Sequence, residues 1–255
     1  MEIKGKTILI TGGGSGIGLE SARQFLAEGA NVIITGRNEA KLDAAKKILP
    51  SLITIKSDVE NQEDALSLFN KIASLGGIDI LYNNAGVGTP ALNLAIANEQ
   101  ILKNAIYEMN VNYFGVIRLN NLFIEMLKSR KESAIINTSS ILSLVPALEE
   151  PTYSATKAAL SFYSQLLRKN LEIQGSNVKV FELLPPVVAT DMTAQRNDKK
   201  MTPEQLVKAL ISGVKRDRFT IRVGDTKLLY IVSRFFPKLA FNLVNPKKIY
   251  ASLKQ

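Results

Sequence analysis

Residues 7–18 read TILITGGGSGIG, a short apolar run that ends in a glycine-rich turn. Thr7–Thr11 is predicted to be a buried strand, and Ile17–Glu28 the helix that follows it. Small residues let the backbone approach a pyrophosphate, and the helix N-terminus offers unpaired N–H groups. The spacing is G-x-x-x-G-x-G, not the general G-x-G-x-x-G, and an ordinary tight turn is the alternative. The strand-to-helix position favours dinucleotide binding, with these predicted contacts: Gly12, Gly14, Ser15, Gly16, Ile17 and Gly18.

The rest of the chain repeats this alternation of short apolar strands and longer helices. Further strands are predicted over Asn31–Thr35, Leu52–Lys56, Ile78–Tyr82, Ser133–Thr138 and Val178–Leu184. Helices are predicted over Glu39–Ile48, Gln62–Ser74, Asn98–Arg130 and Ser154–Ile173, the last opened by Thr152 or Ser154. Strands without polar alternation, joined by helices, indicate a parallel sheet covered on both faces. The fold class is therefore α/β: a single Rossmann-type, doubly wound parallel sheet in three layers, with a C-terminal helical extension.

Residues 1–255 are expected to form one domain. Residues 1–192 would be its cofactor-binding and catalytic core, and 193–255 a substrate loop followed by a basic amphipathic extension. The polar stretch Thr193–Thr202 is expected to be a loop. Thr202 suits a helix N-cap, Pro203 the first helical position, and Gln205 supports the cap, so a helix is predicted to begin there.

The composition excludes several kinds of site. The 255 residues include no His and no Cys. This rules out a Ser-His-Asp triad, a cysteine nucleophile, and an imidazole or thiolate metal site, and no metal is expected. Acid–base chemistry near neutral pH is left to a tuned Tyr, Lys, Asp or Glu.

The residue that reads the adenosine ribose should stand at the end of the second strand. An NAD site places an Asp or Glu there to accept from the 2′-hydroxyl. This chain has Thr35-Gly36-Arg37-Asn38, with no acid. The planar guanidinium of Arg37 suits a 2′-phosphate. The segment predicts NADP(H) as the preferred cofactor, with NAD(H) as the alternative if Arg37 is only a solvated loop arginine.

Six motifs follow one another at a characteristic spacing. They are Thr11–Gly18, Asp58-Val59, Asn83-Asn84-Ala85-Gly86, Asn112 in Asn-Tyr-Phe-Gly, Ser139-Ser140, and Tyr153-Ser154-Ala155-Thr156-Lys157. Together they make the chain resemble the short-chain dehydrogenase/reductase family over about residues 4–192. The run Pro185-Pro186-Val187-Val188-Ala189-Thr190 and the hydrophobic, basic tail resemble the branch named after DltE, a name that implies no settled reaction.

Tyr153 and Lys157 form the predicted catalytic pair. Four residues apart on a helix, they share one face, and the ammonium lowers the pKa of the phenol. Tyr153 is the predicted acid/base, which exchanges a proton with a carbonyl or alcohol oxygen. Ser140, thirteen residues earlier, lies at the carboxyl edge of the sheet and is predicted to donate to the same oxygen; Ser139 is the local alternative. A Tyr–Lys pair on a solvated helix is the plain alternative.

The resemblance implies the remaining roles. Lys157 also bonds the nicotinamide ribose, and Asn112 shapes the active-site helix and holds a water linked to Lys157; the alternative is a polar residue that only distorts the helix. The further cofactor contacts implied are Asp58, Val59, Asn84, Ala85, Gly86, Pro185, Val188 and Thr190. The family often has Pro-Gly where this chain has Pro185-Pro186, so a stiffer, slightly reshaped nicotinamide pocket is expected. A homo-oligomer, dimer or tetramer, would pair the Asn98–Arg130 and Ser154–Ile173 helices.

The end of the chain carries the excess positive charge. Residues 196–255 contain 14 basic and 4 acidic side chains, and the whole chain has a net charge of +9. Within Lys227–Val244, apolar residues recur at helical spacing and alternate with basic residues. The apolar residues are Leu228, Ile231, Phe235, Leu239 and Leu243. Pro237 is expected to end or kink this helix. The segment covers the cleft, packs in an interface, or lies on an anionic membrane surface. A solvated basic face is the plain alternative, and no motif indicates nucleic acid.

These observations predict an NADP(H)-dependent oxidoreductase that interconverts a carbonyl and an alcohol of a small molecule by hydride transfer. A cytoplasmic, alternatively membrane-peripheral, location is expected. Two other functions stay open: a non-catalytic NADP(H)-sensing protein and a membrane-peripheral reductase of a lipid carbonyl. Substrate choice is expected from the mostly apolar Ile141–Glu150, from the segment after Gly86, and from Asp191–Met201.

Overall fold

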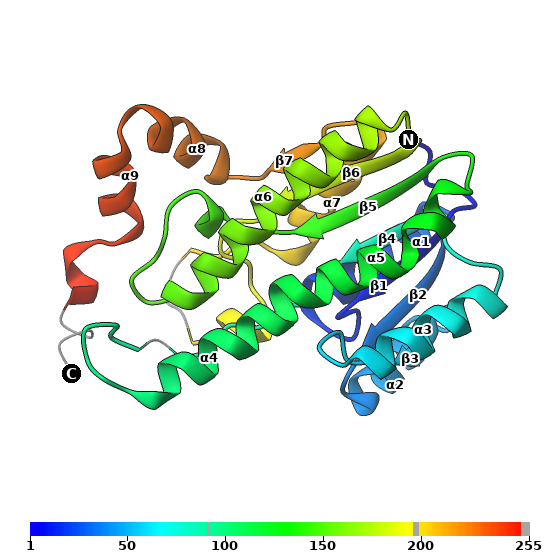
Figure 1. The fold of residues 1–255 in the computed structure, drawn as a ribbon, viewed down its shortest axis with the longest axis horizontal. Coiled ribbons are helices and arrows are strands. Elements are labelled where there is room, and N and C mark those ends of the chain that lie inside the picture. The colour runs from blue at the N-terminus through cyan, green and yellow to red at the C-terminus, as the bar shows by residue number, and fades with distance from the viewer. Residues whose placement is uncertain (91, 196–198, 251–255) are drawn as a thin grey trace.

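One seven-stranded parallel sheet forms the middle of the protein (Figure 1). The structure, a computed structural model, describes residues 1–90, 92–195 and 199–250, and only the backbone of Lys248. The strands are β1 Thr7–Thr11, β2 Asn31–Gly36, β3 Ile53–Lys56, β4 Ile80–Asn83, β5 Ser133–Thr138, β6 Val178–Leu184 and β7 Thr220–Arg222. They lie in the order β3-β2-β1-β4-β5-β6-β7. The order reverses between β1 and β4, where doubly wound sheets open a ligand crevice at their carboxyl ends.

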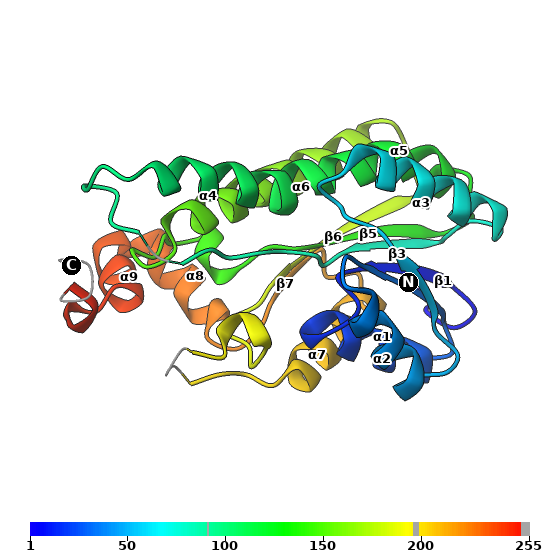
Figure 2. The ribbon, with the colours of Figure 1, turned by 90° about the horizontal axis from the view of Figure 1, so that it is seen from below.

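Helices cover both faces of this sheet, which confirms the predicted three layers (Figure 2). One face carries α1 Gly16–Ala27, α2 Glu39–Ile48 and α7 Pro203–Lys215. The other carries α3 Gln62–Ser74, α4 Glu99–Met109, α5 Gly115–Lys128 and α6 Pro151–Ile173. The helices α8 Thr226–Phe235 and α9 Pro237–Val244 lie at one end of the molecule, outside these layers.

The strands are buried from both sides, which explains why they read as continuous apolar runs. In β1, Ile8 and Ile10 enter the core beneath α1 and α7, whereas Leu9 enters the core beneath α3 and α5. Side chains of a strand alternate between the two faces of the sheet, so both positions need apolar residues here. The two hydrophobic cores fix the carboxyl ends of β1, β4 and β5 at the same edge of the sheet. The predicted site residues follow directly after these strands.

Most predicted boundaries agree with the structure to within two residues, but two predictions need correction and one strand was missed. Helix α6 begins at Pro151 with Glu150 as N-cap, not at Ser154, because the fixed φ of proline suits the first helical turn. The long helix expected over Asn98–Arg130 contains a π-helical turn at Asn110–Phe114. Strand β7 was not predicted, because three residues are too few to show a period.

The helix start at Thr202 has the predicted capping box: the Thr202 hydroxyl accepts from the backbone N–H of Gln205. The loop before it was expected over Thr193–Thr202, and its residues 196–198 lie outside the described residues. The predicted break at Pro237 is also confirmed, since α8 ends at Phe235 and α9 begins at Pro237.

The apolar stripe of the tail does not pack inside the chain. All of its members are exposed: Leu228, Ile231, Phe235, Leu239 and Leu243. The residues that do pack are Leu229 and Ala240, which form a small cluster with Val145 of the loop after β5. Over the described ranges, no helix is long and apolar enough to cross a membrane.

Two leucines on α3 test the packing of this layer. Leu68 is 1% exposed and Leu66, on the same helix, is 43% exposed. We expect Leu68→Ala to lower the free energy of unfolding by about 2–5 kcal/mol, because it leaves a cavity between α3 and the sheet. Leu66→Ala, the matched control, should cost about 1 kcal/mol or less, since a large part of the side chain that it removes already contacts water. Urea unfolding measures both, and equal losses would contradict the orientation of α3.

Candidate active site

The glycine-rich turn has no room for side chains. Gly12 has a φ of +64°, a conformation that L side chains rarely adopt. A Cβ on Gly18 would lie 2.2 Å from the Gly12 carbonyl oxygen. The Asn84 amide donates to the carbonyls of Thr11 and Gly12 at 3.0 and 3.3 Å. The turn is therefore locked between α1 and the end of β4, with the start of α1 left bare for an anionic group.

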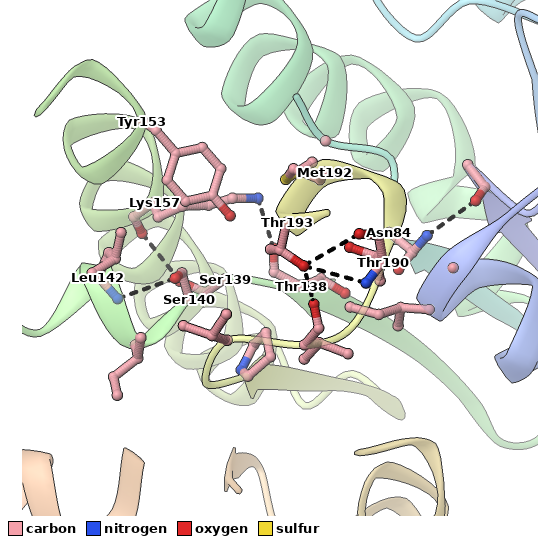
Figure 3. A pocket seen from close by; sticks show the side chains of 18 of the residues that line it. Asn84, Thr138, Ser139, Ser140, Leu142, Tyr153, Lys157, Thr190, Met192 and Thr193 are labelled. Atoms are coloured by element: carbon pink, nitrogen blue, oxygen red, sulfur yellow. Dashed lines mark hydrogen bonds between the residues drawn. The ribbon is translucent and has the colours of Figure 1, made fainter. Parts of the chain in front are cut away.

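A cavity of about 280 Å³ runs from this turn along the carboxyl edge of the sheet (Figure 3). The segments after β4, β5 and β6 form its walls. Most of the predicted site residues line it: Gly12, Ser15, Gly16, Ile17, Asn84, Ala85, Gly86, Ser140, Tyr153, Lys157, Pro185, Val188 and Thr190. Residues distant in sequence thus meet at the crevice between β1 and β4.

Tyr153 and Lys157 project from the first turns of α6 into this cavity (Figure 3). The Lys157 ammonium lies 5.4 Å from the centre of the Tyr153 ring. It donates to the Thr138 carbonyl at 3.0 Å. Burial lowers the pKa of Lys157 from 10.5 to about 8. A cation that is short of water interacts strongly with its neighbours, so Lys157 would stabilise an anion placed beside it.

The two serines after β5 have different surroundings. The Ser139 hydroxyl donates to the Lys157 carbonyl at 3.2 Å. The Ser140 oxygen accepts from the Leu142 N–H at 3.1 Å. Among the described residues, no protein acceptor takes the Ser140 hydroxyl hydrogen, which leaves it for a ligand in the cavity. This geometry favours Ser140 over Ser139 as the donor to a substrate oxygen.

Asn112 lies in the middle of the π-helical turn and is fully buried. Its side-chain oxygen accepts from the Val87 N–H at 2.8 Å, and its NH₂ donates to the Val87 carbonyl at 2.9 Å. The NH₂ also lies 3.1 Å from the Thr156 hydroxyl. Extra turns of this kind occur at functional sites, and this one ties the segment after β4 to α6.

A second hollow lies beside β2, where the sequence predicts the adenosine contacts. It is lined by Gly12, Thr35, Gly36, Arg37, Ser57, Asp58, Val59, Ala85, Gly86, Val87 and Val111. The Arg37 guanidinium donates to the Tyr107 hydroxyl at 2.8 Å and lies 3.8 Å from an Asp58 carboxylate oxygen. The hydrogen bond to Tyr107 is the largest cause that raises the pKa of Arg37. A fixed cation therefore stands at the edge of this hollow.

The loop after β6 closes the end of the cavity that lies beyond the segment after β5. The Pro185 carbonyl oxygen accepts a hydrogen bond from the Ile141 N–H at 3.0 Å, and this bond joins the loop to the segment after β5. Thr190 caps the short helix Asp191–Thr193, and Val188 pairs with Met201. Figure 3 shows Met192 of this helix opposite Tyr153. Gly14, the remaining predicted contact, is packed against Lys41, since a Cβ there would lie 3.3 Å from the Lys41 Cβ.

Three residues at the site carry no sequence signal and were not predicted. Tyr107 holds Arg37. Lys41 forms an exposed ion pair with Asp191 at 2.8 Å, which links α2 to the loop after β6. Asn245, past α9, accepts from the Leu148 N–H at 2.7 Å and donates to the Pro146 carbonyl at 2.9 Å. Each contact joins segments far apart in sequence, so no local pattern could indicate it. Among the described residues, no cluster of acidic side chains forms a candidate metal site.

Comparison with known proteins decides the family. The model of the short chain dehydrogenase family matches residues 6–201. The chain belongs to that family. It is 33% identical over 225 residues to the uncharacterized oxidoreductase DltE of Bacillus subtilis strain 168, covering 86% of this chain and 88% of that protein. This short-chain dehydrogenase is therefore an oxidoreductase of the DltE-like branch.

Solved relatives of this short-chain dehydrogenase contain nicotinamide cofactors. A short-chain dehydrogenase from Burkholderia cenocepacia J2315 in complex with NADP superposes with a TM-score of 0.84, at 25% identity, over 96% of this chain and 99% of that one. One from Burkholderia phymatum, in complex with NAD, has a TM-score of 0.85 at 21% identity over 94% and 96%. The cradle at Gly12 and Gly18 fits such a cofactor, because a Cβ at either position would meet neighbouring backbone.

The buried ammonium makes stability depend on pH. The pKa of Lys157 is about 8 when folded and 10.5 when exposed. Between these values the unfolded chain binds the extra proton, so the free energy of unfolding rises with pH. We expect wild type to gain about 3 kcal/mol over Lys157→Met from pH 7 to pH 11. Urea unfolding of both proteins without cofactor measures the difference, and a pH-independent difference would show that Lys157 is not desolvated.

Proposed function

We propose that this enzyme is an NADP(H)-dependent oxidoreductase that interconverts a carbonyl and an alcohol. The observation that carries the proposal is the meeting of Ser140, Tyr153 and Lys157 around one cavity that continues into the glycine cradle. A donor, an acid/base and a buried cation at one point are what proton transfer to a carbonyl oxygen needs. The bound nicotinamide would supply or take up the hydride.

The protein's part is to bind the substrate oxygen and move one proton. In the reducing direction, Ser140 donates a hydrogen bond to the carbonyl oxygen and Tyr153 gives it the proton. Lys157 stabilises the phenolate left on Tyr153. In the oxidising direction Tyr153 takes the proton from the alcohol. Asn112 holds the segment after β4 against α6, so that Lys157 faces Gly86, and the relay of a proton through a water at Asn112 is part of the proposal.

The preference for NADP(H) over NAD(H) rests on Arg37. Its guanidinium lines the adenosine hollow and is half-exposed. Tyr107 and Asp58 hold it in place, so little rotamer freedom is left to lose when it binds a 2′-phosphate. Asp58, Val59, Asn84, Ala85 and Gly86 complete the adenosine side of the proposed cofactor site, and Pro185, Val188 and Thr190 the nicotinamide side.

The substrate side of the cavity is mainly apolar. Ile141, Leu142, Val187 and Met192 line it, and Glu150 is the acidic residue of the loop after β5 that reaches it. We propose a lipophilic carbonyl as the substrate class. A fatty acyl-CoA reductase of Acinetobacter baylyi is 33% identical to this chain over 214 residues, covering 79% of this chain and 68% of that protein. The intact Ser140–Tyr153–Lys157 set supports turnover over the alternative of a sensor without catalysis.

We propose that two copies pair through α4 and α6. These helices lie side by side on one face of the molecule (Figure 2). Their outer surface is apolar and exposed: Leu102, Ile106, Phe162, Leu166 and Ile173. A contiguous apolar surface of this kind marks a protein interface, and neighbouring apolar side chains on two helices suit a helix bundle between subunits.

The acid/base assignment is tested by deleting a single oxygen. Tyr153→Phe should lower the rate of NADPH consumption on a panel of aldehydes and ketones by about a hundred-fold or more. NADPH binding, measured by fluorescence, should stay close to wild type, because the ring remains. Tyr163→Phe is the matched control, since this hydroxyl lies on the same helix and accepts from Asn120 at 3.3 Å. Turnover near the wild-type rate in Tyr153→Phe would overturn the mechanism.

The cofactor preference is tested at Arg37. Arg37→Ala should weaken NADPH binding about ten- to a hundred-fold, the range for a hydrogen bond to a charged group. NADH binding should change little, because NADH has no 2′-phosphate. Arg23→Ala is the control, since Arg23 is an exposed arginine of α1 paired with Glu20. Equal losses for both cofactors, or no loss for NADPH, would make Arg37 a bystander.

A further inference from the structure

The helices α8 and α9 expose an apolar surface that nothing in the described chain covers. This surface, the tail face, consists of Leu228, Ile231, Phe235, Phe236, Leu239 and Leu243. Phe235 is 73% exposed and Leu228 is 65% exposed. Large side chains gathered on one surface and exposed to this extent mark an interaction site rather than ordinary surface variation.

The tail face is held firmly by the opposite side of the same helices. Leu229 and Ala240 are buried against Val145, and Val232, Phe241 and Val244 join that cluster. Asn245 then bonds the backbone at Pro146 and Leu148. The two helices are therefore docked on the loop after β5 and present their outer side chains in a fixed arrangement. This is a structured surface and not a frayed terminus.

The charged residues of α8, α9 and the segment up to Tyr250 are all basic, although the exposed Asp225 stands at the start of α8. Lys227, Arg234, Lys238 and Lys247 are exposed. The sequence has no acidic residue between Asp225 and the C-terminus. In the part of the chain that the structure describes, none of these four basic residues forms an ion pair. A second copy placed symmetrically on this face would bring two sets of uncompensated cations together, which is unfavourable.

We propose that the tail face docks the protein onto an anionic phospholipid surface. An interfacial helix of this kind buries its apolar side chains at the boundary of headgroups and acyl chains, while flanking lysines and arginines contact lipid phosphates and carboxylates. The break at Pro237 separates two short amphipathic helices, and each exposes large apolar side chains. The charge pattern is what selects lipid over a second copy as the occupant.

Docking would bring the bilayer next to the substrate side of the cavity. Ile141 lines the cavity and also packs against the cluster beneath α8 and α9. Figure 1 shows α8 and α9 at the end of the molecule beyond the carboxyl end of β5. The residues that follow β5 line the cavity. A lipophilic carbonyl dissolved in the bilayer would then reach the cavity over a short path. This consequence rests on the proposed function, whereas the docking itself does not.

The test is co-sedimentation of the purified full-length protein with two kinds of vesicles. One is phosphatidylcholine alone, and the other is an equal mixture of phosphatidylcholine and phosphatidylglycerol. We expect wild type to pellet with the mixed vesicles at low salt and to stay in solution with phosphatidylcholine. The double variant K227E/K238E and the double variant F235S/L239S should each reduce binding about ten-fold or more. The control K47E/K71E changes the net charge equally, at exposed lysines of α2 and α3, and should bind like wild type.

Two further measurements keep the outcomes separate. NADPH binding by every variant shows that the cofactor site is folded, so loss of docking is distinguished from failure of the proposed function. Sedimentation velocity without lipid reports the oligomeric state of wild type and F235S/L239S. Absence of wild type from both pellets, equal binding by K227E/K238E, or a smaller oligomer in F235S/L239S would overturn the proposal, the last because it would make the tail face a subunit interface.

Discussion

The close approach of Gly18 to the Gly12 carbonyl is the constraint on which the rest of the site depends. It brings α1 to the end of β1. The side-chain NH₂ of Asn84, which follows β4, donates a hydrogen bond to the same Gly12 carbonyl. Three segments are thus joined at one backbone oxygen. Because no Cβ fits there, the N-terminus of α1 stays open to an anionic ligand, and the cavity begins at that point.

Buried polar groups then set the positions of the side chains proposed to be catalytic. The Asn83 NH₂ donates to the side-chain oxygens of Asn120 and Asn137, both at 2.9 Å, which ties β4 to α5 and β5. Asn137 in turn donates to Ser164 of α6 at 2.9 Å. A buried polar group that loses its hydrogen-bond partner lowers the stability of the fold. Other packings of α5 and α6 would break this network, so few of them are allowed. Helix α6 is held in register, and Tyr153 and Lys157 with it.

The exclusion of water that makes these hydrogen bonds necessary also changes the chemistry of the buried side chains. Lys157 has a lowered pKa because it is removed from water, and the Thr138 carbonyl is its hydrogen-bond partner. A cation in such a place stabilises an adjacent anion far more than one in solvent. The tail contributes from outside: Asn245 steadies the loop after β5, so this wall of the cavity and the tail face share one support.

Local patterns in the sequence were enough to predict the sheet, nearly all of its strands, most helix boundaries and the glycine-rich turn. Apolar runs, caps and glycines act over a few neighbouring residues, and motif spacing carried the proposed roles of Ser140, Tyr153 and Lys157. The tertiary structure alone decided that Arg37 is held by Tyr107, that Asn245 supports the loop after β5, and that β7 extends the sheet. It also decided that the stripe at Leu228 and Phe235 faces outward while Leu229 packs inward. A helical period shows that a helix has an apolar side, but what covers that side depends on surfaces brought together from distant parts of the chain.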